Sequence, residues 1–204
     1  MTRFVRSIGL ALLGVLAAAF LSFTPVAARA ATIDFEHSDP VIANGYGGLD
    51  WSNFGTHPDY VGGYHTGIVS GSNTAYSFWG EVASIGRQEA FNLYDGYFTS
   101  AWRDGMTLQV LGYKDGIQLY DTSWIINSTG PALLSFNYIG VDFVRFITKG
   151  GILVVSGGEG DNFVMDDLRV EVTQTPIAGA LPLFATALSG LALVVRRKKR
   201  QVTS

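Results

Sequence analysis

The sequence predicts an all-β fold, a β-sandwich of the jelly-roll type, and three observations support this prediction. Short segments alternate apolar and polar residues, as antiparallel strands do when one face is buried and the other is solvated. Glycine, with 25 of the 204 residues, and asparagine recur between these segments at positions suited to turns. No window shows the sustained apolar spacing of a helix. We therefore expect many short strands in two packed sheets.

The clearest element is a β-hairpin in the middle of the chain. In Met106–Tyr113 the apolar residues Met106, Leu108 and Val110 alternate with polar ones. Lys114-Asp115-Gly116 follows, and a second apolar segment comes directly after it. An Asp-Gly pair between two such segments is the usual sequence of a tight hairpin turn.

Other segments of strand length share this alternation or a bounded apolar run. The last of them is typical, because Leu168, Val170 and Val172 alternate with Arg169 and Glu171. Gly55–His65 lacks the pattern and is predicted to be a loop. The further predicted strands are Thr32–Glu36, Leu49–Phe54, Gly67–Ser70, Thr74–Trp79, Ala90–Leu93, Gly96–Ala101, Ala132–Tyr138, Asp142–Thr148 and Asn162–Val172.

The first 30 residues have the three parts of a secretory signal peptide. Arg3 and Arg6 precede the apolar run Ile8–Phe23, and Ala28-Arg29-Ala30 offers small residues for cleavage by signal peptidase. We expect cleavage after Ala30, which makes residues 31–173 the sandwich domain. The alternative is an uncleaved anchor helix.

The C-terminal residues 174–204 have the pattern of a membrane anchor. After the short linker Gln174–Pro176, the uncharged stretch Ile177–Val195 is long enough to cross a bilayer core of about 30 Å as a helix. A run of five cations, Arg196 to Arg200, then fixes which side of the membrane the tail occupies. The sequence therefore predicts an exported protein that is held at a membrane at least transiently, with its middle part outside the cytoplasm.

The charge distribution excludes some partners. All seventeen acidic residues but only six of the basic ones lie in the predicted domain, so its net charge is −11. Such a domain repels nucleic acid and anionic lipid. The absence of cysteine excludes disulfides and thiolate metal sites.

The C-terminal segment resembles the sorting signals of the PEP-CTERM family of exported bacterial proteins. The resemblance rests on Pro176, on Ala180-Leu181-Pro182-Leu183, on the apolar span and on the cations led by Arg196, Arg197 and Lys198. The Pro-Glu-Pro triplet of the family is absent, and the segment is closer to the VPLPA-type variant. The resemblance implies processing by an exosortase-type enzyme and association with extracellular polysaccharide in a matrix or biofilm. It also implies that the membrane is the bacterial inner membrane, and that the protein then lies at the periplasmic face, on the cell surface or outside the cell. An ordinary tail anchor is the alternative.

The body loosely resembles carbohydrate-binding jelly-roll domains. The similar segments are Thr32–Glu36, Asn44–Phe54 and Asn162–Val170. The resemblance implies that the first and last strands pair and that their carboxylates hold a structural calcium ion.

Four carboxylates are candidate calcium ligands: Asp34, Glu36, Asp161 and Asp166. Alternation places Asp34 and Glu36 on one face of the first strand, and it places Asp166 and Asp167 on opposite faces of the last. Calcium prefers several oxygen ligands of this kind. The alternative is that all are solvated edge and turn residues.

Aromatic side chains supply the candidate carbohydrate-binding site. The rings of Tyr60, Tyr64, Tyr94 and Trp102 are candidates because flat rings stack on the C–H faces of sugars and nearby polar residues can bind hydroxyl groups. The alternative is that most of these rings belong to the core.

The sequence does not predict an enzyme. It contains no nucleophile elbow, zinc-protease or phosphate-loop motif, and its histidines, His37, His57 and His65, all fall in the first third of the chain. Together, the two resemblances and the aromatic candidates imply polysaccharide binding in the bacterial envelope or extracellular matrix. The alternatives are a hydrolase or lyase acting on such a polymer, and a purely structural matrix protein.

Overall fold

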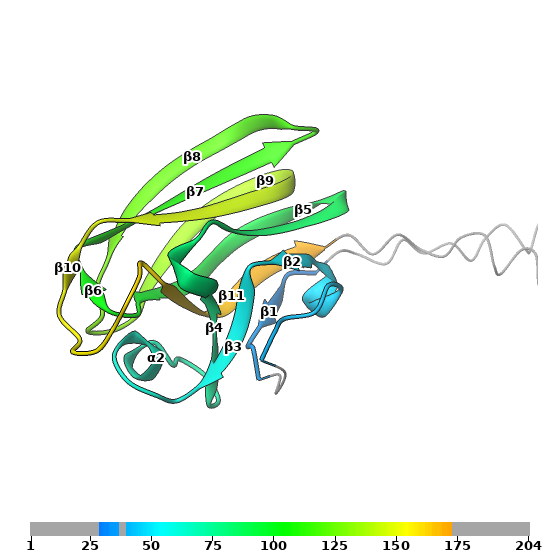
Figure 1. Cartoon of the computed structure of the whole chain (residues 1–204). Helices are drawn as coiled ribbons and strands as arrows, with labels where there is room; N and C mark the ends of the chain where they lie inside the picture. The colour runs from blue at the N-terminus through cyan, green and yellow to red at the C-terminus, as the bar shows by residue number, and fades with distance from the viewer. Residues whose placement is uncertain (1–28, 37–39, 173–204) are drawn as a thin grey trace, which may run out of the picture. The chain divides into compact units, whose positions relative to one another are not determined.

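The computed structural model describes residues 29–36 and 40–172 (Figure 1). The predicted signal peptide up to residue 28 and the predicted linker, transmembrane helix, sorting signal and basic tail lie outside these residues. Within the described ranges, no helix combines the length and the apolar character that crossing a membrane requires.

The structure confirms an all-β fold. Within the described residues, three single-turn helices connect the strands: η1 (Tyr46–Gly48), α2 (Gly63–Thr66) and η2 (Phe78–Gly80). The strands are β1 (Ala31–Ile33), β2 (Asp50–Ser52), β3 (Phe54–Pro58), β4 (Asn73–Ser77), β5 (Ala83–Ser100), β6 (Arg103–Asp104), β7 (Met106–Lys114), β8 (Ile117–Ile126), β9 (Ala132–Lys149), β10 (Ile152–Leu153) and β11 (Phe163–Val172).

Two long strands, β5 and β9, run through both layers of the fold. One block of pairing joins residues 83–86 of β5 to residues 143–146 of β9, and a second joins residues 91–98 to residues 132–141. The register shifts between the two blocks, where both strands bend. Bulges of this kind are how strands pass from one packed layer to another.

The two layers follow from this pairing. The β7 layer consists of β8, β7, the second half of β9, the first part of β5, and β2. The β11 layer consists of the first half of β9, the rest of β5, β11, β4 and β3, with β1 added beside β11. Figure 1 shows β7 and β8 on one side of the domain and β1, β3 and β4 on the other.

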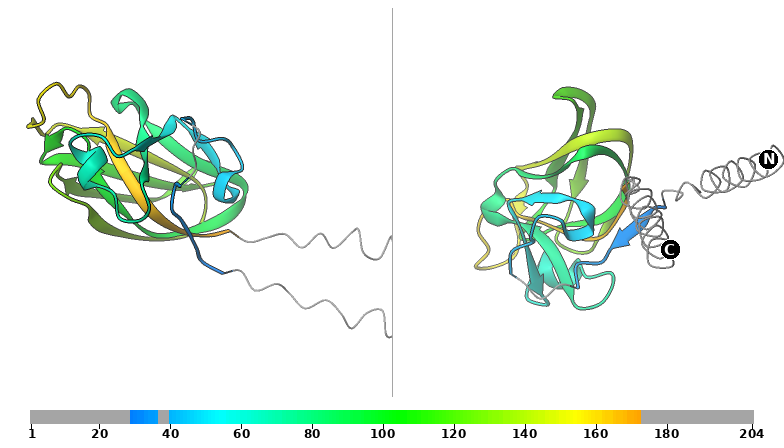
Figure 2. Two further views of the ribbon diagram at one scale, coloured as in Figure 1. Left: turned by 90° about the horizontal axis from the view of Figure 1, so that it is seen from below. Right: turned by 90° about the vertical axis from the view of Figure 1, so that its right-hand side faces the viewer.

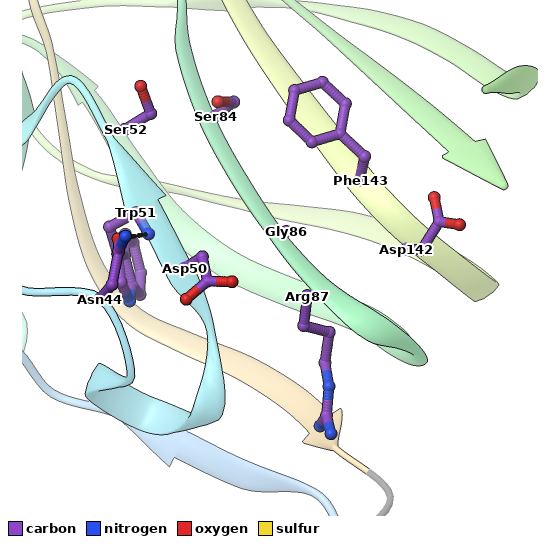
Figure 3. A pocket seen from close by; sticks show the side chains of 9 residues that line it. All are labelled: Asn44, Asp50, Trp51, Ser52, Ser84, Gly86, Arg87, Asp142 and Phe143. Atoms are coloured by element: carbon purple, nitrogen blue, oxygen red, sulfur yellow. Dashed lines mark hydrogen bonds between the residues drawn. The ribbon is translucent and has the colours of Figure 1, made fainter. Parts of the chain in front are cut away.

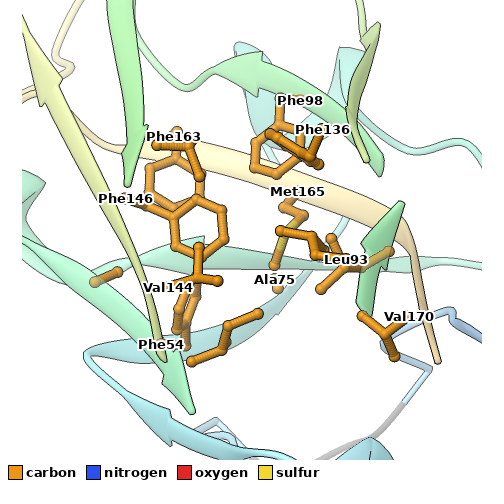
Figure 4. Close-up of a cluster of buried hydrophobic side chains, with 14 of the residues drawn as sticks. Phe54, Ala75, Leu93, Phe98, Phe136, Val144, Phe146, Phe163, Met165 and Val170 are labelled. Atoms are coloured by element: carbon orange, nitrogen blue, oxygen red, sulfur yellow. The ribbon is translucent and has the colours of Figure 1, made fainter. Parts of the chain in front are cut away.

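The main core lies between these layers (Figure 4). Phe146 of the β7 layer contacts three rings of the β11 layer, with centroid distances of 5.8 Å to Phe54, 6.0 Å to Phe98 and 5.7 Å to Phe163. All four rings are almost completely buried. Burial of an aromatic side chain stabilises a fold by about 2 kcal/mol, so this group is a major source of stability.

A stacked tyrosine pair joins the edge strand β8 to the opposite layer. The rings of Tyr120 and Tyr138 lie 4.4 Å apart with planes inclined by 9°. The hydroxyl of Tyr138 donates a 2.8 Å hydrogen bond to the carbonyl of Val110 in β7. Gly112 lies beneath both rings, because a Cβ there would approach each of them to about 3 Å.

The predicted hairpin is confirmed. β7 and β8 pair along their length, and the two residues between them, Asp115 (φ 50°) and Gly116 (φ 76°), have positive φ. Two positive φ values are the mark of the tight turn that Asp-Gly favours. Pairing of the first and last predicted strands is also confirmed, since Ala31 of β1 lies opposite Val170 of β11.

Two local predictions are wrong. Gly55–His65 is not wholly a loop, because it contains most of β3 and the start of α2. Gly67–Ser70 is not a strand, because it forms a loop whose backbone N–H groups bind the carboxylate of Asp166. In both cases contacts with distant residues decide the conformation, and the local sequence does not contain them.

Strand boundaries also differ from those predicted. Ala90–Leu93 and Gly96–Ala101 are parts of β5, and Ala132–Tyr138 and Asp142–Thr148 are parts of β9. The predicted strand Leu49–Phe54 is divided at Asn53, which has φ 63°. β2 then belongs to the β7 layer and β3 to the β11 layer.

Candidate functional site

An aromatic cluster covers the outer face of the β11 layer. Phe54 in β3 faces the core, so alternation turns Gly55 and His57 outward, and Tyr76 of β4 lies opposite Gly55 on the same face. The short helix α2 lies over this face and adds its own tyrosine. The aromatic cluster consists of His57, Tyr60, Tyr64, Tyr76, Phe78 and Trp102.

Tyr64 is the buried centre of the aromatic cluster. It is 5% exposed, and its ring centroid lies 5.1 Å from His57, 5.4 Å from Tyr76 and 5.2 Å from Trp102. Burial raises the pKa of the Tyr64 phenol well above its ordinary value, with a smaller contribution from Tyr76. The phenol therefore stays neutral.

Tyr60 is the exposed member. Its side chain is 63% exposed, although its ring lies 5.3 Å from His57 and 6.5 Å from Tyr64. An aromatic ring held by neighbouring rings yet open to solvent is arranged to receive another flat apolar surface. The half-buried rings of His57 and Tyr76 extend this surface towards β4.

Glycines set the position of α2. A Cβ on Gly63 would collide with the carbonyl oxygen of Ser100 in β5, so only glycine lets the helix lie this close. The N–H of Gly63 donates to the carbonyl of Ala101 at 2.8 Å. At the other end of the helix, the hydroxyl of Thr66 donates to the carbonyl of Ser128 at 2.6 Å. The helix that carries Tyr64 is thereby fixed to the sheet.

Polar groups border the exposed rings. The carboxylate of Asp59 and Nδ1 of His65 are 2.7 Å apart, and both side chains are more than half exposed. Nδ1 of His57 lies 2.6 Å from the carbonyl of Pro58. These groups can exchange hydrogen bonds with hydroxyl groups of a molecule that stacks on Tyr60.

Trp102 supports the cluster from below. Gly158 lies against one side of its indole, because a Cβ at that position would be 2.6 Å from a ring atom. Tyr64 lies 5.2 Å from the same ring. Trp102 is half-buried and helps to hold Tyr64 in place.

Three of the four predicted carbohydrate-binding residues therefore lie together, and the fourth does not. Tyr60, Tyr64 and Trp102 belong to the aromatic cluster. Tyr94 lies apart from them. The guanidinium carbon of Arg169 is 5.0 Å from the centroid of the Tyr94 ring, and the Tyr94 hydroxyl hydrogen-bonds to Glu171.

The aromatic cluster also contains residues that the sequence did not single out. His57 and Tyr76 join the cluster through the pairing of β3 with β4, which local patterns do not reveal. Trp79 follows Phe78 directly in η2 and is 84% exposed, with φ 56°. A bulky residue at positive φ is strained, and strain of this kind often accompanies function.

The four predicted calcium ligands do not gather at one point. Glu36 accepts hydrogen bonds from the N–H groups of Ser72 and Asn73, both at 2.8 Å. Asp166 accepts them from Val69 and Ser70, and Asp161 pairs with Arg103 at 2.8 Å. Asp34 accepts a long bond from the N–H of Glu36. Among the described residues, no three His, Cys, Asp or Glu side chains come close enough to hold a metal. Calcium binding stays a prediction.

The prediction that Asp166 and Asp167 point to opposite faces is wrong. Asp166 binds the N–H of Ser70, and Asp167 accepts a 2.8 Å hydrogen bond from the Ser70 hydroxyl. Asp167 has φ 48°, and the register of β11 against β5 shifts directly after Asp166. Strand alternation therefore fails at this point.

Comparisons with known proteins find matches among solved structures but none among family models or curated sequences. No protein-family model and no curated sequence matches the chain, so its resemblance to PEP-CTERM proteins stays a prediction. The structure of TmCBM61 in complex with β-1,4-galactotriose has 10% sequence identity to this chain and a TM-score of 0.34. The similarity covers 60% of this chain and 85% of that protein's chain. Family 16 Carbohydrate Binding Module-2 has 10% sequence identity and a TM-score of 0.21, and the similarity covers 61% of this chain and 86% of that protein's chain. At TM-scores this low, neither likeness indicates the function of this chain.

Proposed function

We propose that the domain binds neutral polysaccharide through the aromatic cluster. The observation that carries this proposal is the ring of Tyr60, which is 63% exposed and is supported from the inside by His57 and Tyr64. A pyranose ring has an apolar C–H face and polar edges. It can stack on Tyr60 while Asp59 and His65 bind its hydroxyl groups.

The charge of the domain supports a neutral polymer. The predicted domain has a net charge of −11, and the guanidinium of Arg103 is paired with Asp161. A polyanion would therefore meet net repulsion from the domain.

The proposed role is binding without bond cleavage. Glycoside hydrolysis needs two carboxyl groups about 5–10 Å apart on either side of the bond. The carboxylate beside Tyr60, that of Asp59, is instead paired with His65. The cluster offers ring faces and hydrogen-bonding groups, which suffice for recognition.

The same proposal places the domain outside the cytoplasm. Its support is the sequence at both ends of the chain, with a predicted signal peptide before Ala31 and an apolar span with five following cations after Pro176. We propose that signal peptidase removes the first segment and that an exosortase-type enzyme processes the second. Mass spectrometry of the protein from its native host tests this, because an intact Arg196–Ser204 terminus would contradict processing.

Affinity electrophoresis tests polysaccharide binding. The full chain is run in gels that contain dextran, galactomannan, β-1,4-galactan or mixed-linkage β-glucan, with alginate as the polyanion. We expect retardation by at least one neutral polymer and not by alginate. Tyr60→Ala should abolish the retardation, while Tyr60→Phe should retain most of it because the ring remains.

Ile117→Ala is the matched control. Ile117 is 67% exposed, close to the value for Tyr60, but lies at the β7–β8 turn in the other layer. Equal retardation of the wild type and Tyr60→Ala would contradict the proposal. New reducing ends in the polymer would favour the hydrolase, and assembly without sugar would favour the structural protein.

A further inference from the structure

A groove of about 420 Å³ lies on the outer face of the β7 layer (Figure 3). Most of its lining comes from three adjacent strands: β2 supplies Asp50 and Ser52, β5 supplies Ser84 and Gly86, and β9 supplies Phe143. The volume falls within the range of small-molecule sites, which is about 300–1,000 Å³.

A missing side chain opens the floor of this groove. Asp50 pairs with Gly86 across β2 and β5, and Gly86 pairs with Phe143 across β5 and β9. The three residues form one row on the outer face. A Cβ on Gly86 would lie 3.1 Å from the ring of Phe143, so glycine leaves a slot between the Asp50 carboxylate and this ring.

The two sides of the slot differ in chemistry. Phe143 is 39% exposed and its ring lies 6.0 Å from that of Tyr113 in β7, which supports it from behind. Asp50 is exposed on the other side, and the hydroxyls of Ser52 and Ser84 form the next row of pairs. A flat apolar ring opposite hydrogen-bonding groups matches a sugar, which has an apolar face and polar edges.

The charge around the groove again fits a neutral molecule. The guanidinium of Arg87 donates to Glu89 at 2.8 Å, and the carboxylate of Asp142 accepts from the ammonium of Lys114 at 3.3 Å and from the N–H of Asp115 at 2.8 Å. The carboxylate of Asp50 adds a negative charge on its side. An anionic sugar would meet net repulsion here.

The groove and the aromatic cluster lie on opposite outer faces. Ser52 and Ser84 face outward from the β7 layer, whereas His57 and Tyr76 face outward from the β11 layer. The main core, with Phe146 against Phe54, fills the space between. One polysaccharide chain therefore cannot lie along both surfaces without passing around the domain.

We propose that the groove is a second binding site for the same neutral polysaccharide, and that the domain links two polymer chains. This inference rests on the proposed function of the aromatic cluster. Two binding sites that face in opposite directions let one domain hold two polysaccharide chains at once. The domain therefore cross-links the polymer.

Light scattering tests the link between chains. The full chain is mixed with whichever of dextran, galactomannan, β-1,4-galactan or mixed-linkage β-glucan retards it in gels. For the wild type, we expect scattering to rise with added protein and to fall again when protein is in excess, as cross-linking requires. Asp50→Ala and Phe143→Ala, made separately, should lower the maximum about tenfold while gel retardation persists.

The variants separate the possible failures. Asp50 is exposed, so Asp50→Ala decides the question if Phe143→Ala does not fold, and Ile117→Ala should scatter like the wild type. Retardation without scattering, or equal scattering by the wild type and Asp50→Ala, would overturn the second site and leave the first intact. No retardation of the wild type by any of the four polymers would instead overturn the proposed function.

Discussion

The buried carboxylate of Asp166 accepts a 3.0 Å hydrogen bond from the backbone N–H of Ser70 and so joins β11 to the loop that follows α2. The same oxygen accepts a bond from Val69 at 2.7 Å. Despite these bonds, burial raises the pKa of Asp166 above its ordinary value, to about 6.

The first prediction concerns the pH dependence that Asp166 causes. Between about pH 4 and pH 6 the folded state holds a proton that the unfolded state has released. The contribution of Asp166 to the free energy of unfolding therefore falls as the pH rises, by at most about 3 kcal/mol. Urea unfolding of the wild type and Asp166→Asn across this range should show the wild type losing stability relative to the variant as the pH rises. A stability difference between the two proteins that does not change with pH would contradict the raised pKa of Asp166.

The second prediction is an opposite pH dependence at Glu36, which binds the other end of the same loop. The N–H of Asn73 is the largest cause of its lowered pKa. A lowered pKa means that the ionised form stabilises the fold above the ordinary pKa, and that this stability is lost as the pH falls.

Glu36→Gln should therefore reduce the free energy of unfolding by about 1 kcal/mol at pH 7 and have little effect below about pH 4. Urea unfolding at both pH values measures this. Glu159→Gln, at another exposed acid, is the control and should change neither value. Equal losses at the two pH values would show that charge plays no part.

The third prediction is that α2 tolerates no side chain at Gly63. Gly63→Ala would push the helix away from Ser100 and reduce the free energy of unfolding by about 1–3 kcal/mol. Tyr64 moves with the helix, so retardation by polysaccharide should weaken as well. Gly130→Ala is the control, because nothing lies within 4 Å of a Cβ there, and its effect should stay below about 0.5 kcal/mol. Wild-type stability in Gly63→Ala would mean that the helix can shift freely.

The fourth prediction is that Trp79 lowers the stability of the domain and strengthens its binding to polysaccharide. Trp79→Gly removes a bulky residue at φ 56° that buries little surface, since 84% of it is exposed. We expect the free energy of unfolding to rise by about 1 kcal/mol and polysaccharide retardation to weaken. Chemical unfolding and affinity electrophoresis measure the two effects. A loss of stability would instead show that the ring packs against the domain.

The sequence predicted those elements whose conformation depends on neighbouring residues. The Asp115-Gly116 turn is an example, because its positive φ values are a property of these residues themselves. The burial of Leu168 and Val170 and the exposure of Arg169 also follow from simple alternation. The aromatic content indicated Tyr60, Tyr64 and Trp102, and the fold brings these three together.

Tertiary contacts determine those parts of the fold and of the candidate site that the sequence did not predict. No local pattern shows that Asn53 separates β2 and β3 into different layers. Nor does any local pattern show that the four predicted calcium ligands bind backbone N–H groups and an arginine side chain. The groove depends on Gly86 lying between Asp50 and Phe143, residues far apart in the chain. Such sites follow from strand register, which the sequence does not specify at this level.

The first and last strands of the described domain are neighbours, and they leave it close together (Figure 2). β11 also pairs with β5, and with β4 further along. A mechanical load transmitted through the C-terminal side of the chain would thus pull on an interior strand. Hydrogen bonds on both of its sides would have to shear together, which resists force far better than peeling an edge strand one bond at a time. A domain tethered at that end and holding polymer would be suited to sustained tension.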